Sequence, residues 1–162
     1  MIKSEGMIEK VPITREGLEK LRQELQNILA VERPNNIKAL EEARSHGDLN
    51  ENAEYHAAKE RRSFLEAKIN ELEMAINRSE VIEIDKKDIE RVVFGVTVEL
   101  RNMATSENVA YQLVGPYDSD PDSGRISVTS PLGKALIGKE EGDEFKIKTP
   151  GGIQQFEILE IR

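Results

Sequence analysis

Apolar residues recur at helical spacing through the first part of the chain. They follow one another at steps of three, four and three residues, at Leu18, Leu21, Leu25 and Ile28. A stripe this narrow is typical of a coiled-coil helix, and it predicts a helix over residues 14–44. Pro34 should kink this helix, because proline lacks a backbone donor and its ring clashes with the preceding turn.

A second stripe predicts another helix over residues 50–79. Its members are Tyr55, Ala58, Arg62, Leu65, Ile69, Leu72 and Ile76. In an antiparallel pair of helices, facing residues have a nearly constant sum of sequence numbers. This holds for the pairs 18 with 76, 21 with 72, 25 with 69, 28 with 65 and 40 with 55. The same register places Arg62 opposite Glu32. We therefore expect a hairpin that reverses near residue 47 and forms an arm of roughly 45 Å at 1.5 Å per residue.

The pattern changes after Arg78, where short β-type runs bounded by turn residues replace the helical stripes. The predicted strands are 81–84, 92–100, 109–114, 125–129, 144–148 and 155–161. Residues 131–138 suggest a short helix. The sequence thus predicts an α+β protein with an N-terminal antiparallel coiled-coil hairpin over residues 8–79 and a β-rich domain over residues 80–162. Residues 1–7 are expected to be an N-terminal extension.

Composition narrows the function classes. The 162 residues include no cysteine, so the chain has neither disulfides nor thiolate metal ligands. No apolar run approaches the roughly 18 residues that a membrane span needs. The first residues lack the apolar core of a signal peptide, which makes the cytoplasm the expected compartment. The formal net charge is −8, so a direct grip on nucleic-acid phosphates is not expected.

The predicted reversal point holds both histidines of the chain and two carboxylates, Asp48 and Glu51. Gly47 suits a chain reversal because it tolerates positive φ. In one interpretation, Asp48 caps the second helix and Glu51 completes a capping box. In another, each carboxylate gives one oxygen to Mg²⁺, whose octahedral shell a second macromolecule must complete. A zinc site of His46, Asp48 and His56 is a third interpretation.

Two long motifs resemble the signatures of a known family. They are Gly47-Asp48-Leu49-Asn50-Glu51-Asn52-Ala53-Glu54-Tyr55 and Ser130-Pro131-Leu132-Gly133-Lys134-Ala135-Leu136-Ile137-Gly138-Lys139. Two further segments match as well, Val31-Glu32-Arg33-Pro34 and Ile147-Lys148-Thr149-Pro150-Gly151-Gly152. From about Ile8 onward the chain resembles the bacterial Gre transcript-cleavage factors. Its nearly neutral hairpin is similar to the branch of that family with the less basic hairpin face.

The resemblance implies a function and a set of site residues. It implies that the C-terminal domain is FKBP-like and docks at the rim of the secondary channel of RNA polymerase. The docking segment would include Ser130, Pro131, Leu132, Gly133, Leu136, Ile137, Gly138 and Lys139. The hairpin would enter the channel, where Asp48 and Glu51, the candidate catalytic residues, would help hold the second catalytic Mg²⁺ and its attacking water. The polymerase would then cut backtracked RNA near the nascent 3′ end.

The chain would accordingly be a transcription elongation factor and not an enzyme. We expect a monomer that contacts nucleic acid only through the polymerase and does not bind Mg²⁺ stably by itself. One alternative is an inhibitor of the same architecture, although such relatives have altered acidic tips and both carboxylates are present here. A second is a structural hairpin whose tip is only a capping box. A free-standing metallohydrolase would need ligands that the chain lacks.

Overall fold

The computed structural model describes residues 9–162, which form two compact units. One unit, residues 19–78, is a helical hairpin, and the other combines residues 9–18 with residues 79–162 and contains the strands. The predicted fold class, an α+β protein with an antiparallel helical hairpin and an FKBP-like β-rich part, is confirmed. The predicted extension, residues 1–7, lies outside the described residues.

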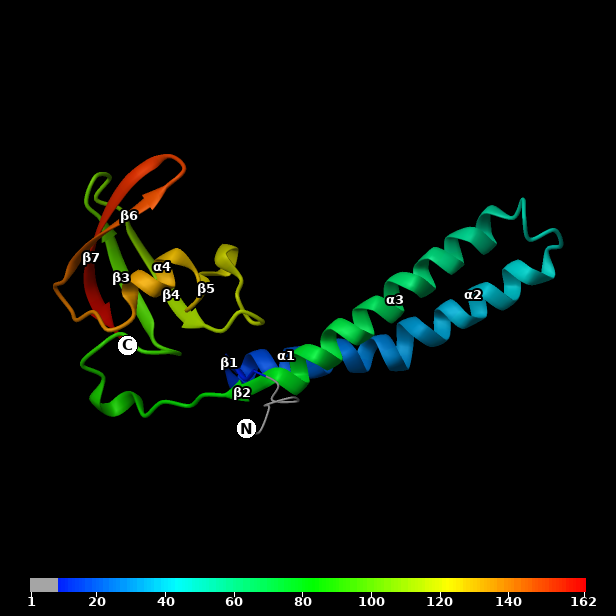
Figure 1. Ribbon diagram of the computed structural model, residues 1–162, viewed down its shortest axis with the longest axis horizontal. Helices are drawn as coiled ribbons and strands as arrows, with labels where there is room; N and C mark the ends of the chain where they lie inside the picture. Colours follow the sequence, from blue (N-terminus) through cyan, green and yellow to red (C-terminus); the bar gives the residue numbers. More distant parts are fainter. Residues whose placement is uncertain (1–8) are drawn as a thin grey trace, which may run out of the picture. The chain divides into compact units, whose positions relative to one another are not determined.

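The hairpin consists of two antiparallel helical segments that run side by side (Figure 1). The first segment is made of α1 (Arg15–Asn27), a π-helical turn (Ile28–Glu32) and α2 (Arg33–Ser45). The second is α3 (Ala53–Arg78), whose 26 residues span roughly 39 Å at 1.5 Å per residue. The two long helices that the sequence predicts are present, and the second begins later than residue 50.

Apolar side chains between the two segments form the core of the hairpin. The buried members are Ile28, Leu65, Ile69 and Leu72, with Leu21 and Leu25 packed against them. These residues come from the positions that the predicted register pairs. The predicted contact between Arg62 and Glu32 is wrong, because Arg62 is exposed and the Nη2 of Arg61 lies 2.6 Å from Glu32 Oε1. The π-helical turn changes the helix face that Glu32 occupies, so Glu32 does not continue the regular stripe.

The first helical segment adapts to Pro34 one turn before that residue. The Arg33 N–H donates to the carbonyl of Ile28, five residues back, which widens the helix locally. A proline ring clashes with the carbonyl four residues before it, here that of Ala30. The wider turn therefore accommodates Pro34 without ending the helix.

A buried asparagine lies in the seam where the apolar stripe of the first segment is interrupted. Asn36 is 6% exposed, and its Nδ2 donates to the carbonyl oxygen of Ala58 on α3 at 2.9 Å. The pattern of apolar positions alone did not reveal this contact. A single satisfied polar group in a helical seam favours one register over its neighbours, because a shift would leave the group unpaired.

The β-rich unit is built on a five-stranded sheet of order β5-β4-β3-β7-β6. The strands are β3 (Thr97–Asn102), β4 (Asn108–Val114), β5 (Arg125–Ser127), β6 (Glu144–Thr149) and β7 (Gly152–Ile161). Neighbours are antiparallel except β4 and β5, which run parallel. Leu136 of the short helix α4 (Pro131–Leu136) belongs to the same buried cluster as Val98, Leu113 and Ile158 of the strands. The helix α4 therefore covers one face of the sheet.

Two short strands were not placed correctly by the sequence. A parallel pair joins β1 (Val11–Ile13) to β2 (Ser79–Val81), whereas the sequence predicted a strand at residues 81–84 and a hairpin domain that begins at residue 8. This pairing groups residues 9–18 with the β-rich unit. Three residues are too few to show an alternating pattern, and their partner lies far along the chain. The predicted strand 92–100 begins only at Thr97, since Gly95 has φ +90°.

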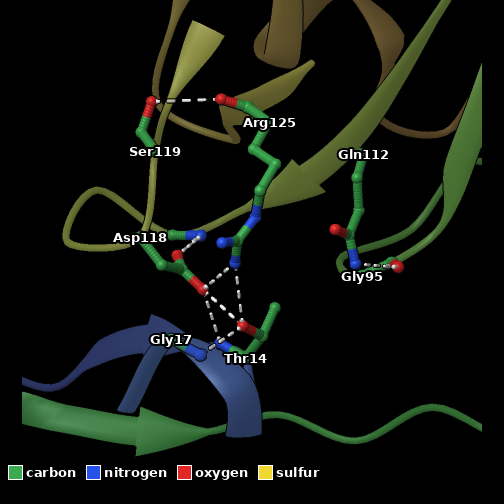
Figure 2. A network of polar contacts seen from close by, with 8 residues as sticks. Thr14, Gly17, Gly95, Gln112, Asp118, Ser119 and Arg125 are labelled. Carbon is green, nitrogen blue, oxygen red and sulfur yellow. Dashed lines mark hydrogen bonds and ion pairs between the residues drawn. The ribbon is translucent and has the colours of Figure 1, made fainter. Parts of the chain in front are cut away.

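A buried polar network joins the start of α1 to the loop after β4 (Figure 2). Asp118 Oδ2 accepts hydrogen bonds from Thr14 Oγ1 at 2.6 Å and from the Thr14 N–H at 2.9 Å. Its Oδ1 accepts from the Gly115 N–H at 2.6 Å, and Arg125 Nη2 lies 3.4 Å from Oδ2. Thr14 Oγ1 in turn accepts from the Gly17 N–H at 3.0 Å, which caps the first turn of α1.

Candidate functional site

The loop between α2 and α3 carries the predicted site residues. At the end of α2 the His46 N–H donates to the carbonyl of Ala43 at 3.2 Å. Gly47 follows with φ +107°, a left-handed conformation that favours glycine and turns the chain back. Asp48 and Glu51 lie beyond this turn, and both side chains are exposed. The structure therefore places the two candidate carboxylates together on the tip loop of the hairpin.

The capping-box interpretation of Asp48 and Glu51 is wrong. The N-cap of α3 is Asn52, whose Oδ1 accepts from the Tyr55 N–H at 3.0 Å. Asp48 Oδ1 accepts instead from the Asn50 N–H at 3.0 Å, which is a local turn within the loop. Sequence reasoning missed the N-cap because Asp48 and Asn52 are both favourable capping residues.

The carboxylates of the tip are largely unengaged by the chain itself. Within residues 9–162, no hydrogen bond or ion pair involves Asp48 Oδ2 or either carboxylate oxygen of Glu51. Carboxylate oxygens are the ligands that Mg²⁺ prefers in proteins, and here they are exposed on a loop held at both ends by helices. The donor set therefore fits a magnesium ion whose other ligands come from a partner.

The two histidines of the tip are not arranged as zinc ligands. His56 Nε2 lies 3.0 Å from the carbonyl oxygen of Asn50, and since a carbonyl only accepts, Nε2 carries the proton. His46 Nε2 lies 3.8 Å from Glu54 Oε2. Across the described part of the chain, no three His, Asp or Glu side chains are grouped closely enough to hold a metal ion. The predicted zinc site of His46, Asp48 and His56 is therefore wrong.

The second predicted site, residues 130–139, consists mainly of residues that build the fold. Ser130 Oγ caps α4 by accepting from the Gly133 N–H at 3.0 Å, and it donates to the Ser127 carbonyl at 2.6 Å. A Cβ on Gly133 would lie 2.1 Å from that same carbonyl oxygen, so no larger residue fits. Leu136 is fully buried, and Leu132 packs against the same core. Gly133 and Leu136 are buried, and Ser130 and Leu132 are partly buried, so these four residues contribute mainly to the fold.

The remaining part of this segment borders an apolar groove. Gly138 donates to the carbonyl of Val92 at 2.8 Å, and Val92 donates to the carbonyl of Lys139 at 2.8 Å. This pairing brings Val93 beside Ile137, whose side chain is 42% exposed. The groove has a volume of about 600 Å³ and is lined by Pro12, Ile82, Val93, Phe94, Val128, Lys134 and Ile137. Sequence reasoning missed most of these residues, because five separate segments of the chain contribute them.

Comparison with known families covers nearly all of the described chain. Residues 11–81 match the family model described as transcription elongation factor, N-terminal, and residues 86–162 match transcription elongation factor, GreA/GreB, C-term. The chain belongs to the GreA/GreB family of transcription elongation factors. The resemblance seen in the two sequence motifs is thereby confirmed. The N-terminal match begins in β1 and ends in β2, so it includes both strands of the parallel pair.

Relatives within the GreA/GreB family are similar over almost their full length. The transcription elongation factor GreA of Syntrophobacter fumaroxidans is 52% identical over 153 residues, which cover 94% of this chain and 98% of that protein. GreA of Rhodospirillum rubrum is 50% identical over 155 residues, covering 96% and 99%. Both relatives are named GreA, which confirms the prediction, made from the nearly neutral hairpin, that the chain is most similar to the GreA branch of the family.

A solved structure is also similar to this chain. The crystal structure of GreA factor homolog 1 of Thermus thermophilus is 30% identical, covers 95% of this chain and 99% of that chain, and has a TM-score of 0.42. None of the helices formed by residues 9–162 has the length and apolar character to cross a membrane.

Proposed function

We propose that this GreA/GreB-family chain inserts its hairpin into the secondary channel of RNA polymerase and stimulates the polymerase to cut backtracked RNA. The observation that carries this proposal is the tip loop, where the carboxylates of Asp48 and Glu51 are exposed and largely unengaged. They stand at the end of an arm of roughly 39 Å, estimated from the 26 residues of α3. An arm of this kind can carry two carboxylates into a narrow channel that a globular unit cannot enter.

Asp48 and Glu51 would hold Mg²⁺ jointly with the polymerase. When bound, the ion supplies Lewis-acid activation of an RNA phosphodiester and favours attack by water. Two carboxylates cannot complete an octahedral shell, so the polymerase and its RNA must provide the other ligands. The chain would therefore act as a factor that completes the active site of another enzyme.

The β-rich unit would dock at the rim of the channel. We assign this contact to the apolar groove that contains Ile137 and Val93, and not to the whole segment 130–139, because Ser130, Gly133 and Leu136 build the fold. Exposed apolar side chains around a groove are typical of protein interaction sites. The protein would then act in the cytoplasm, where the bacterial polymerase is found. It would bind the polymerase as a monomer.

A cleavage assay on stalled elongation complexes tests the proposal. Three incubations are compared, all with Mg²⁺ and labelled RNA. The first contains the backtracked polymerase complex alone, the second contains this chain with RNA freed from the polymerase, and the third contains the backtracked complex with this chain. We expect shortened RNA with a new 3′ end, and renewed elongation, only when both proteins are present. Slower elongation without cleavage would support a channel-occupying inhibitor, and cleavage by the chain alone would show that it is an enzyme.

A further inference from the structure

One side chain closes the base of the loop that carries Asp48 and Glu51. Asn52 Nδ2 donates to the carbonyl oxygen of Ala43 in the last turn of α2 at 2.6 Å. Its Oδ1 accepts from the Tyr55 N–H in the first turn of α3 at 3.0 Å. The first amides of a helix have no intrahelical partner, so Asn52 satisfies the Tyr55 N–H of α3. The Ala43 carbonyl already accepts from the His46 N–H, and Asn52 adds a second donor to it at the end of α2. Asn52 is half-buried, whereas most of the loop is exposed.

Capping alone does not require an asparagine at this position. Aspartate and serine also accept from the first amides of a helix, and they cap as well as asparagine does. An ionised aspartate has no proton to donate, however, and a serine side chain is too short to reproduce both contacts of a carboxamide. The contact with Ala43 is thus the feature that distinguishes asparagine from other N-cap residues here.

A second contact holds the loop from the side of α3. His56 Nε2 donates to the carbonyl oxygen of Asn50 at 3.0 Å. Asn50 and Asn52 are the two neighbours of Glu51 in the chain, so the backbone on both sides of Glu51 is tied to helices. Glu51 itself is held by no side-chain contact among the described residues, so its position depends on this backbone.

We propose that Asn52 is a positioning residue for the tip carboxylates, and that His56 assists it from the other side of Glu51. This role rests on the function proposed above. Asn52 acts through the loop and contacts neither the metal ion nor the RNA. Groups that orient metal ligands change activity by about 10- to 100-fold when they are removed. A small displacement of Glu51 should therefore lower the cleavage rate without weakening the docking of the protein.

The test compares Asn52→Asp and Asn52→Ser with the parent protein. Both variants keep an N-cap oxygen, and the serine variant adds no charge near the tip. We expect the concentration of factor that gives half-maximal cleavage to stay within about twofold, because the docking surface is unchanged, and the maximal rate to fall about tenfold. The control Asn70→Asp makes the same chemical change at an exposed position of α3 and should match the parent protein.

A second measurement does not depend on the polymerase. Backbone NMR relaxation of the Glu51 amide reports the mobility of the loop, and we expect mobility to rise in Asn52→Asp and Asn52→Ser. His56→Gln offers an N–H in place of Nε2 and should stay near the parent values in both measurements. His56→Leu should raise the mobility of Glu51 and lower the maximal rate.

The outcomes separate this inference from the proposed function. If the parent protein stimulates cleavage and Asn52→Asp and Asn52→Ser retain its maximal rate, capping is the whole role of Asn52 and the positioning role is overturned. Unchanged mobility of Glu51 in both variants would also overturn it. A parent protein that stimulates no cleavage would overturn the proposed function, and this role with it.

Discussion

Asp118 Oδ2 lies 2.6 Å from Thr14 Oγ1, although the two residues are 104 positions apart in the chain (Figure 2). Asp118 is 2% exposed at its side chain and serves four groups at once: two donors of Thr14, the Gly115 N–H and the Arg125 guanidinium. The contact secures the first turn of α1 to the β-rich unit. The parallel pairing of β1 with β2 also holds the residues directly before Thr14 in the β-rich unit.

Replacing Asp118 by Ala should destabilise the β-rich unit. The change leaves Thr14 and Gly115 without their acceptor and Arg125 without its carboxylate. Loss of one partner of a largely buried pair costs roughly 3 kcal/mol in the free energy of unfolding. Urea denaturation of the full chain measures the change. Asp122→Ala removes an exposed carboxylate from the same loop and should change the unfolding free energy by less than about 0.5 kcal/mol. Equal stability of the two variants would contradict the role of Asp118.

Gly17→Ala should also destabilise the protein, against the usual effect of this substitution in a helix. Alanine is normally preferred over glycine in a helix by about 1 kcal/mol. A Cβ on Gly17 would, however, lie 2.4 Å from Asp118 Oδ2, so the network must shift. Thermal unfolding should show a lower midpoint than that of the parent protein. Gly151→Ala is the matched control, since its Cβ would come no closer than 3.9 Å to another atom. A raised midpoint in Gly17→Ala would show that the contact is loose.

The buried Asn36 allows a test of the hairpin seam. Asn36→Leu replaces a satisfied polar group by an apolar one and should change stability by less than about 1 kcal/mol. Asn36→Asp places a carboxylate against the carbonyl of Ala58 and should cost about 2 kcal/mol or more. Denaturation followed by helical circular dichroism measures both. Asn70→Asp, exposed on α3, supplies the reference value for the same change in charge. A destabilisation by Asn36→Asp no larger than this reference would contradict the buried contact.

The sequence predicted what depends on local periodicity. The stripe through Leu21, Leu25 and Ile28 determined the hairpin and its register, and Gly47 located the reversal. The sequence pattern did not predict the strand Val11–Ile13, whose partner is Ser79–Val81, because such a pairing depends on residues far apart in the chain. The N-cap and the apolar groove were missed for related reasons. Several residues at the tip are acceptable caps, and the groove combines segments that no periodic pattern connects.

Docking through the apolar groove predicts a loss of polymerase binding in Ile137→Glu. The side chain is 42% exposed, so the substitution introduces a charge into the groove with little effect on folding. We expect affinity for the polymerase to fall at least about tenfold, since an unpaired charge in an interface carries a desolvation cost of that order. Competition with the labelled parent protein measures it. Ile153→Glu places the same charge at a residue that is 71% exposed and does not line the groove. If both variants bind as the parent protein does, docking uses another surface.

The central claim is that Asp48 and Glu51 act as metal ligands at the polymerase active site. Because Asn52 is the N-cap of α3, neither Asp48→Asn nor Glu51→Gln removes a helix cap, and both variants should unfold at the same temperature as the parent protein. Each amide replaces an anionic ligand by a weaker neutral one, so extra Mg²⁺ should partly restore activity.

The most direct measurement is the rate of RNA cleavage in a backtracked elongation complex, at limiting Mg²⁺ and with saturating Glu51→Gln. We predict a rate at least about tenfold below that of the parent protein, with partial recovery as Mg²⁺ is raised and with unchanged binding to the polymerase. The full parental rate in Glu51→Gln would contradict the assignment of Glu51 as a metal ligand.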